Sequence, residues 1–179
     1  AAVRGEEVRF AENGVKDMVR RVLLPWWNSL SFLVTYAHVD EWDPAESDLD
    51  APSTNELDIW IRVKMEQLKT KVSNEMDAYE LSRVIPPLLD FIDDLTNWYI
   101  RRSRRRFWKG EDSADKEHAY CTLYRVLLDF AELMAPFTPF MAEHVYQILR
   151  VTPETQACDS VHLRILPEPR PLTQEEETV

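Results

Sequence analysis

Glycine is scarce in this chain, with only Gly5, Gly14 and Gly110 among 179 residues. Tight β-turns and phosphate-wrapping loops depend on glycine, because their backbones need positive φ angles or a close approach to the ligand. The sequence therefore contains no nucleotide-binding loop of the Gly-x-Gly-x-x-Gly or Walker type. The shortage also favours a helical protein over one built from β-hairpins.

Cysteine and long apolar runs are scarce as well. The two cysteines, Cys121 and Cys158, lack the Cys-x-x-Cys spacing of metal sites, which predicts two free thiols rather than a metal centre or a disulfide framework. The four histidines share no His-x-x-x-His spacing, and we interpret His144 as an ordinary surface or boundary residue. No apolar run approaches the roughly 18 residues that a membrane span needs, so we expect a soluble chain without a membrane partner.

The residues that are present indicate a folded, acidic domain. Hydrophobic residues make up 45% of the chain and aromatic residues 11%, which excludes a largely disordered protein. A length of 179 residues suits one domain with tails. The net charge of −11 argues against binding nucleic acid through overall attraction, but it permits a local basic site.

One short stretch reverses the acidic character of the chain. Five arginines lie between positions 101 and 106, with Trp98 before them and Trp108 after them. The apolar spacing upstream predicts that this stretch is the end of a helix, where the helix dipole favours each exposed cation by about 0.3–1 kcal/mol. Repulsion among five guanidinium groups opposes that gain. Helix stability alone is therefore a poor reason for the cluster, and a bound polyanion is a better one.

The residues leave two explanations of these arginines open in equal measure. Some of them could pair with Asp112, Asp115 or Glu117 at the start of the following helix. Alternatively, arginines with interleaved aromatic residues could contact RNA phosphates and stack on RNA bases.

No catalytic constellation can be assembled from the sequence. Asp93 and Asp94 are adjacent, but neighbouring helix positions point about 100° apart, so the two carboxylates do not share one acid–base site. We expect one of them to pair with a basic residue instead. We also expect Trp26, Trp27 and Trp60 in the core.

Apolar residues at three- and four-residue spacing predict an all-α bundle over residues 1–150. We expect a helix break or kink near Leu24, an N-cap at Ser53 or Thr54, and a fresh helix start at Pro86 after a short turn. The predicted helices span about 14–24, 26–38, 55–72, 86–107, 113–134 and 139–149. Residues 151–179 are predicted to be a linker towards a missing C-terminal region, with a short extended strand at 161–165.

The arginine-rich stretch also resembles a known family. Residues 93–108, Asp-Asp-Leu-Thr-Asn-Trp-Tyr-Ile-Arg-Arg-Ser-Arg-Arg-Arg-Phe-Trp, are similar to a signature of the anticodon-binding helical domain of isoleucyl-tRNA synthetases, which are class I enzymes. Residues 23–28, 55–61 and 134–143 agree with that family in order and spacing. Val3-Arg4-Gly5 and the residues up to Lys16 look most like the eukaryotic-type branch. The related valyl enzyme usually has an acidic residue where this chain has Arg101, and Pro86-Pro87 departs from the family pattern.

The resemblance implies a tRNA-binding module of a cytoplasmic ligase that charges tRNA(Ile) with isoleucine at the expense of ATP. The family's His-x-Gly-His and Lys-Met-Ser-Lys-Ser motifs do not occur here, so ATP, magnesium and catalysis would belong to a separate catalytic domain of the same protein, and this chain would hold no cofactor. The implied partners are tRNA(Ile) and the catalytic and C-terminal domains. The implied phosphate contacts are Arg101, Arg102, Arg104, Arg105 and Lys109, and the implied base or loop contacts are Asn28, Asn97 and Trp98.

The sequence leaves two alternatives to this interpretation open. One is the equivalent domain of a valyl-tRNA synthetase. The other is a helical protein–protein interaction module, in which the arginines pair with carboxylates of the same chain.

Overall fold

The computed structural model describes residues 11–108, 113–174 and 176, and within these ranges it contains helices and no strand. The all-α prediction is therefore confirmed. The helices are α1 (Glu12–Met18), the π-helical η1 (Val19–Leu23), α2 (Leu24–Val39), α3 (Glu56–Asp77), α4 (Leu81–Asp93), the π-helical η2 (Asp94–Ile100), α5 (Arg101–Trp108), α6 (Ser113–Met134), α7 (Pro139–Leu149), α8 (Pro153–Gln156) and the 3₁₀ turn η3 (Val161–Leu163). No helix in the described ranges is long and apolar enough to cross a membrane.

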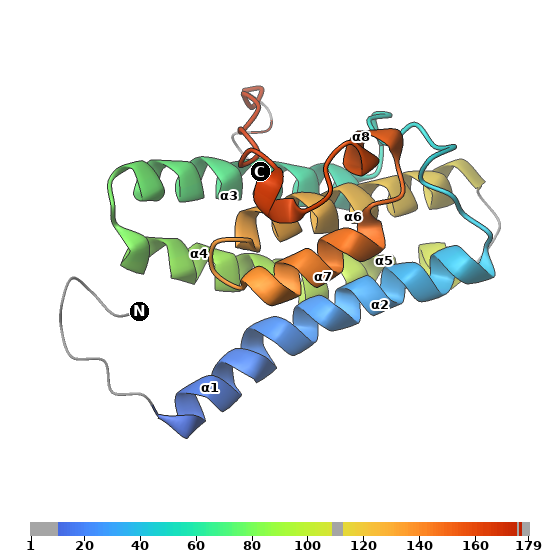
Figure 1. Cartoon of the computed structure of the whole chain (residues 1–179). Helices are drawn as coiled ribbons and strands as arrows, with labels where there is room; N and C mark the ends of the chain where they lie inside the picture. The colour runs from blue at the N-terminus through green and yellow to red at the C-terminus, as the bar shows by residue number, and fades with distance from the viewer. Residues whose placement is uncertain (1–10, 109–112, 175, 177–179) are drawn as a thin grey trace.

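Helix α6 lies at the centre of the bundle because its sequence is apolar on almost every side. From Ala119 to Ala135, only Arg125 and Asp129 are not buried. The helix packs against α2, α3, α5 and α7. Figure 1 shows α3 and α4 as an antiparallel pair and the long α1–α2 helix running along the side of the bundle opposite to α3. This arrangement brings α2 beside η2, the segment that leads into the arginine-rich α5.

The first helix is continuous through Pro25, so of the break or kink expected near Leu24 the break is wrong. Proline removes one backbone donor and its ring crowds the preceding turn, and the wider π turns of η1 accommodate both effects without ending the helix. The buried face continues across the π segment. Its members are Val22, Trp26, Leu30 and Leu33, each with at most 2% of its surface exposed.

Helix α4 also begins earlier than predicted, at Leu81, and carries Pro86 and Pro87 in its interior. The two prolines cost hydrogen bonds in the first turns only, and Pro86 is exposed, so water can satisfy the freed carbonyl groups. Burial of Val84 and Leu88 holds this part of the chain helical despite the prolines. The N-cap of α3 differs as well: it is Asn55, whose side chain accepts a hydrogen bond of 3.0 Å from the backbone N–H of Leu57.

The strand predicted near the C-terminus is wrong, because residues 161–163 form a 3₁₀ turn. The alternation of Val161, Leu163 and Ile165 does not define a buried face: Val161 is 2% exposed, but Leu163 and Ile165 are 70% and 87% exposed. Val161 packs into the core cluster, so this part of the C-terminal segment lies on the bundle. The division into residues 1–150 and 151–179 stays a prediction.

A buried ionic network ties α5 to the rest of the bundle. Arg106 donates to both carboxylate oxygens of Asp58, at 2.7 and 2.8 Å, and to Asp115 Oδ2 at 2.8 Å. Asp58 is fully buried and also accepts from the Tyr99 hydroxyl at 2.8 Å. Burial disfavours the charged form of Arg106, but the hydrogen bonds to the two carboxylates outweigh it and raise the pKa of the guanidinium. The network thus joins α3, η2, α5 and α6.

Replacing Arg106 should destabilise the fold far more than replacing its exposed neighbour. Arg106→Leu leaves the buried Asp58 carboxylate without its counter-charge, and we expect a loss of about 3–5 kcal/mol in the free energy of unfolding, measured in urea. Arg105→Leu removes an exposed arginine of the same helix and should change that free energy by about 0.5 kcal/mol or less. Equal losses in the two variants would contradict the structural role of Arg106.

The contact between α7 and the C-terminal segment should depend on pH through Glu143. Partial burial raises the pKa of this carboxyl, but hydrogen bonds from Gln147, Ser160 and the backbone N–H of Val161 outweigh that effect and lower it below its ordinary value of 4.5. The carboxylate therefore contributes stability that is complete above the ordinary pKa and is lost as the pH falls through the lowered one.

Glu143→Gln should consequently unfold more easily than the unchanged chain at pH 7. The gap between their free energies of unfolding should narrow as the pH falls from about 5 to about 3. Urea titrations at a series of pH values measure this gap. A gap that stays constant with pH would refute the assignment.

Candidate nucleic-acid interface

Four of the five clustered arginines are exposed on α5, namely Arg101, Arg102, Arg104 and Arg105. In the described part of the chain, none of these four forms an ion pair, whereas Arg106 pairs with Asp58 and Asp115. Of the two explanations from the sequence, internal pairing therefore applies to Arg106, with Asp115 as one partner. The other four remain available to an external anion.

Two exposed tryptophans flank the four arginines. Trp98, at the end of η2, has 48% of its surface exposed, and the Arg102 guanidinium lies 4.3 Å from the centre of its ring. Such an exposed cation–π contact stabilises by about 0.5–1 kcal/mol and holds the guanidinium parallel to a flat aromatic surface. Trp108 is 58% exposed and donates its indole N–H to the Tyr36 hydroxyl of α2.

A groove of about 500 Å³ lies between α2 and the η2–α5 segment. It brings together three of the residues that the resemblance implied: Asn28 from α2, Asn97 from η2 and Arg104 from α5. Trp98, Arg101, Arg102 and Arg105 lie outside this groove, on the neighbouring surface of η2 and α5. Lys109 falls outside the described residues. The residues lining the groove are Pro25, Asn28, Ser29, Ser31, Phe32, Thr35, Tyr36, Thr96, Asn97, Ile100 and Arg104.

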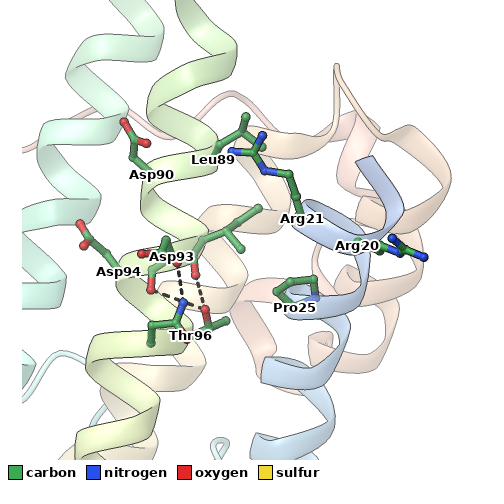
Figure 2. Close-up of a pocket in the computed structure, with 10 residues that line it drawn as sticks. Arg20, Arg21, Pro25, Leu89, Asp90, Asp93, Asp94 and Thr96 are labelled. Atoms are coloured by element: carbon green, nitrogen blue, oxygen red, sulfur yellow. Dashed lines mark hydrogen bonds between the residues drawn. The ribbon is translucent and has the colours of Figure 1, made fainter. Parts of the chain in front are cut away.

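A second hollow of about 570 Å³ adjoins this groove and shares Pro25, Thr96 and Asn97 with it. Figure 2 shows Arg21 reaching from η1 towards α4, and Arg20, which also lines the hollow, extending in the opposite direction from Arg21. Neither arginine is among the residues that the sequence pattern or the resemblance indicated. The signal that could have found them is a pair of adjacent basic residues on an amphipathic helix in an otherwise acidic chain.

Asp93 and Asp94, on the acidic side of the second hollow, do not have the partners that we predicted. We predicted that Asp93 or Asp94 pairs with a basic residue, but neither forms an ion pair in the described part of the chain. Asp93 instead accepts a hydrogen bond from the side-chain amide of Asn97. Burial raises the pKa of Asp94, and the neighbouring charges of Asp93 and Asp90 raise it further, against the effect of Lys64. In Figure 2 the Asp90 and Asp94 side chains point to the side of α4 away from Arg21.

The three tryptophans predicted for the core have different environments. Trp26 is fully buried, as predicted. Trp27 is 37% exposed, so the prediction that it lies in the core is wrong. Its ring stacks on that of His144, with the two ring centres 5.5 Å apart, and both rings lie at the surface. Trp60 is half-buried, and the Lys64 amine lies 5.9 Å from the centre of its ring.

Comparison of the sequence with known protein families shows to which family the chain belongs. A sequence model of the family described as the anticodon-binding domain of tRNA ligase matches residues 58–179. The chain belongs to this family. The match begins at Asp58, the buried partner of Arg106, and includes the whole of α5. The α2 side of the groove lies before it.

Relatives of this anticodon-binding domain carry the same name in several bacteria. The chain is 46% identical over 172 residues to an isoleucine–tRNA ligase of Chlamydia trachomatis serovar A, 43% identical over 166 residues to one of Chlamydia pneumoniae, and 41% identical over 177 residues to one of Treponema denticola. Each match covers 93% of this chain but 16% of the relative, so the chain corresponds to a small part of those proteins.

Proposed function

We propose that this anticodon-binding domain holds the anticodon stem and loop of tRNA(Ile), as part of an isoleucine–tRNA ligase. The observation that carries the proposal is the set of four exposed arginines on α5, which form no ion pair with any residue that the structure describes and lie beside a polar groove. The relatives, 41–46% identical and named isoleucine–tRNA ligases, support the choice of amino acid and tRNA.

The chemistry of α5 suits the phosphate backbone of a folded RNA. A guanidinium group is always charged and offers two parallel donors to the oxygens of one phosphate. Phosphate contacts fix the position and register of a nucleic acid, and contacts to base edges discriminate its sequence. In this proposal the arginines hold the stem and loop, and the groove residues Asn28 and Asn97 face the bases.

Aminoacylation itself would take place in a catalytic domain outside this chain. That domain would bind ATP and magnesium. This module, together with a C-terminal domain, would position it by binding the anticodon end of the tRNA, which is distant from the site of catalysis. We further propose a cytoplasmic location for the whole ligase. The eukaryotic-type branch stays a prediction, since the three relatives described above come from Chlamydia and Treponema.

The alternatives receive less support. A protein-interaction module in which the five clustered arginines pair internally requires carboxylate partners for them, and among the five only Arg106 has such partners in the described part of the chain. A valyl enzyme is not favoured, because the relatives described above are isoleucine–tRNA ligases.

Charge reversal on α5 should weaken tRNA binding without affecting the fold. Arg101→Glu with Arg105→Glu removes two phosphate contacts and adds two repulsive charges, so the dissociation constant for tRNA(Ile) should rise by at least about tenfold at low salt. Filter binding or gel-shift titration measures the constant, and circular dichroism checks the helical content. For about four neutralised phosphates, the slope of log affinity against log salt should be about −3 in the unchanged chain, and smaller in the variant.

A matched control is available at the far end of the α3–α4 pair. Lys71→Glu with Arg83→Glu changes the net charge by the same amount, at two exposed positions near the end of α3 and the start of α4. Both side chains pair with Glu75, at 2.6 and 4.0 Å, so circular dichroism must show that the control keeps its helical content. This control should keep nearly all of the affinity. Equal losses in both double variants would show that overall charge, and not the α5 surface, governs the binding.

A further inference from the structure

The groove between α2 and η2–α5 is built from two facing stripes of side chains. Asn28, Ser31 and Thr35 follow one another on α2 at helical spacing, which places them on one face of that helix. Their side chains make no hydrogen bond within the described part of the chain, so their donors and acceptors are open to a ligand. Asn97, Ile100 and Arg104 form the opposite stripe on η2 and α5.

Apolar groups lie between these polar side chains. The same groove is also lined by Pro25 and Phe32 from α2 and by Ile100 from η2. A volume of about 500 Å³ falls within the range of pockets that hold small ligands of nucleoside size. A flat ring with polar edges and a negatively charged attachment matches this lining, since the apolar groups contact its faces, the amides and hydroxyls meet its edges, and Arg104 meets the phosphate.

Two π-helical segments line the second hollow, which adjoins the groove. Segment η1 precedes Asn28 and contributes Arg21, and segment η2 contributes Thr96 and Asn97. Turns of this kind are rare and occur frequently at functional sites. Both segments line the adjoining hollow, and η2 also lines the groove, which is consistent with a binding site.

Asp93 determines what Asn97 offers to a ligand. An ionised carboxylate can only accept hydrogen bonds, so it binds the NH₂ group of the Asn97 amide and turns the amide oxygen away from itself. Asp93 lies four residues before Asn97 and lines the adjoining hollow. The amide therefore presents an oriented acceptor, together with its second N–H.

We infer that Asp93 is a positioning residue, which fixes the Asn97 amide of this groove for reading one base of the anticodon loop. The inference rests on the proposed function and specifies its base contacts. Binding through the α5 arginines depends on charge and is shared by all RNA hairpins of one shape, whereas the oriented amide distinguishes one base from another.

The test uses hairpin RNAs that share the anticodon stem of tRNA(Ile) and differ at one loop nucleotide at a time, titrated against the full 179-residue chain. At the loop position read by the groove, the unchanged chain should prefer its best base over the worst by at least about fivefold. Asp93→Asn lets the Asn97 amide rotate, and Asn97→Ala removes it. In both variants the preference should fall to within about twofold, while the salt slope and the helical content stay unchanged.

Asp90→Asn is the matched control, because it removes the same charge one turn earlier on α4, from a side chain that points away from Arg21 (Figure 2). It should keep the full preference. The inference is overturned if Asp93→Asn keeps the preference, if Asp90→Asn loses it equally, or if the unchanged chain binds all loop variants alike. In each of these cases arginine-dependent binding of the hairpins would persist, and the proposed function would stand. If the unchanged chain binds none of the hairpins, both the inference and the proposed function fail.

Discussion

The buried pairing of Arg106 with Asp58 is the interaction on which the rest of this structure depends. It fixes the rotation of α5 about its own axis. Because Ser103, Arg106 and Phe107 are three and four residues apart, they lie on one face of the helix, and that face is turned towards the bundle. The remaining arginines of the helix must then face outward. One guanidinium neutralised inside the protein thus orients four exposed ones, which have no carboxylate partner among the described residues.

The same interaction reconciles a basic surface with an acidic chain. The net charge of −11 keeps the overall field unfavourable for polyanions, so binding has to occur where cations are concentrated and carboxylates are turned aside. Around the groove, Asp90 and Asp94 point away from Arg21, and Asp93 is engaged with an amide (Figure 2). A domain of this kind gains little from non-specific attraction, which leaves discrimination to the local arrangement of arginines, amides and hydroxyls.

The prolines show how packing outweighs local preference. Pro25, Pro86 and Pro87 each disfavour the helix in which they are found, yet both helices continue through them. In each case a regularly spaced apolar face is buried against a neighbouring helix, and burial of several large side chains at about 1.5–3 kcal/mol each exceeds the cost of a missing hydrogen bond. In the first helix the compensation takes the form of a π turn. That turn carries Arg20 and Arg21 and lies directly before the residues that line the groove.

The sequence by itself determined the helical class, because the spacing of apolar residues is a local property that any helix must satisfy. It also determined that a basic and aromatic cluster ends one helix, and the likeness to a family pointed to Asn28 and Asn97. Only the tertiary structure decided which arginine is buried, since the five are chemically identical and the choice depends on where Asp58 and Asp115 lie after folding. The path through the prolines and the meeting of α2 with η2 were decided in the same way, because each depends on contacts between residues far apart in the chain or on the energy of burial.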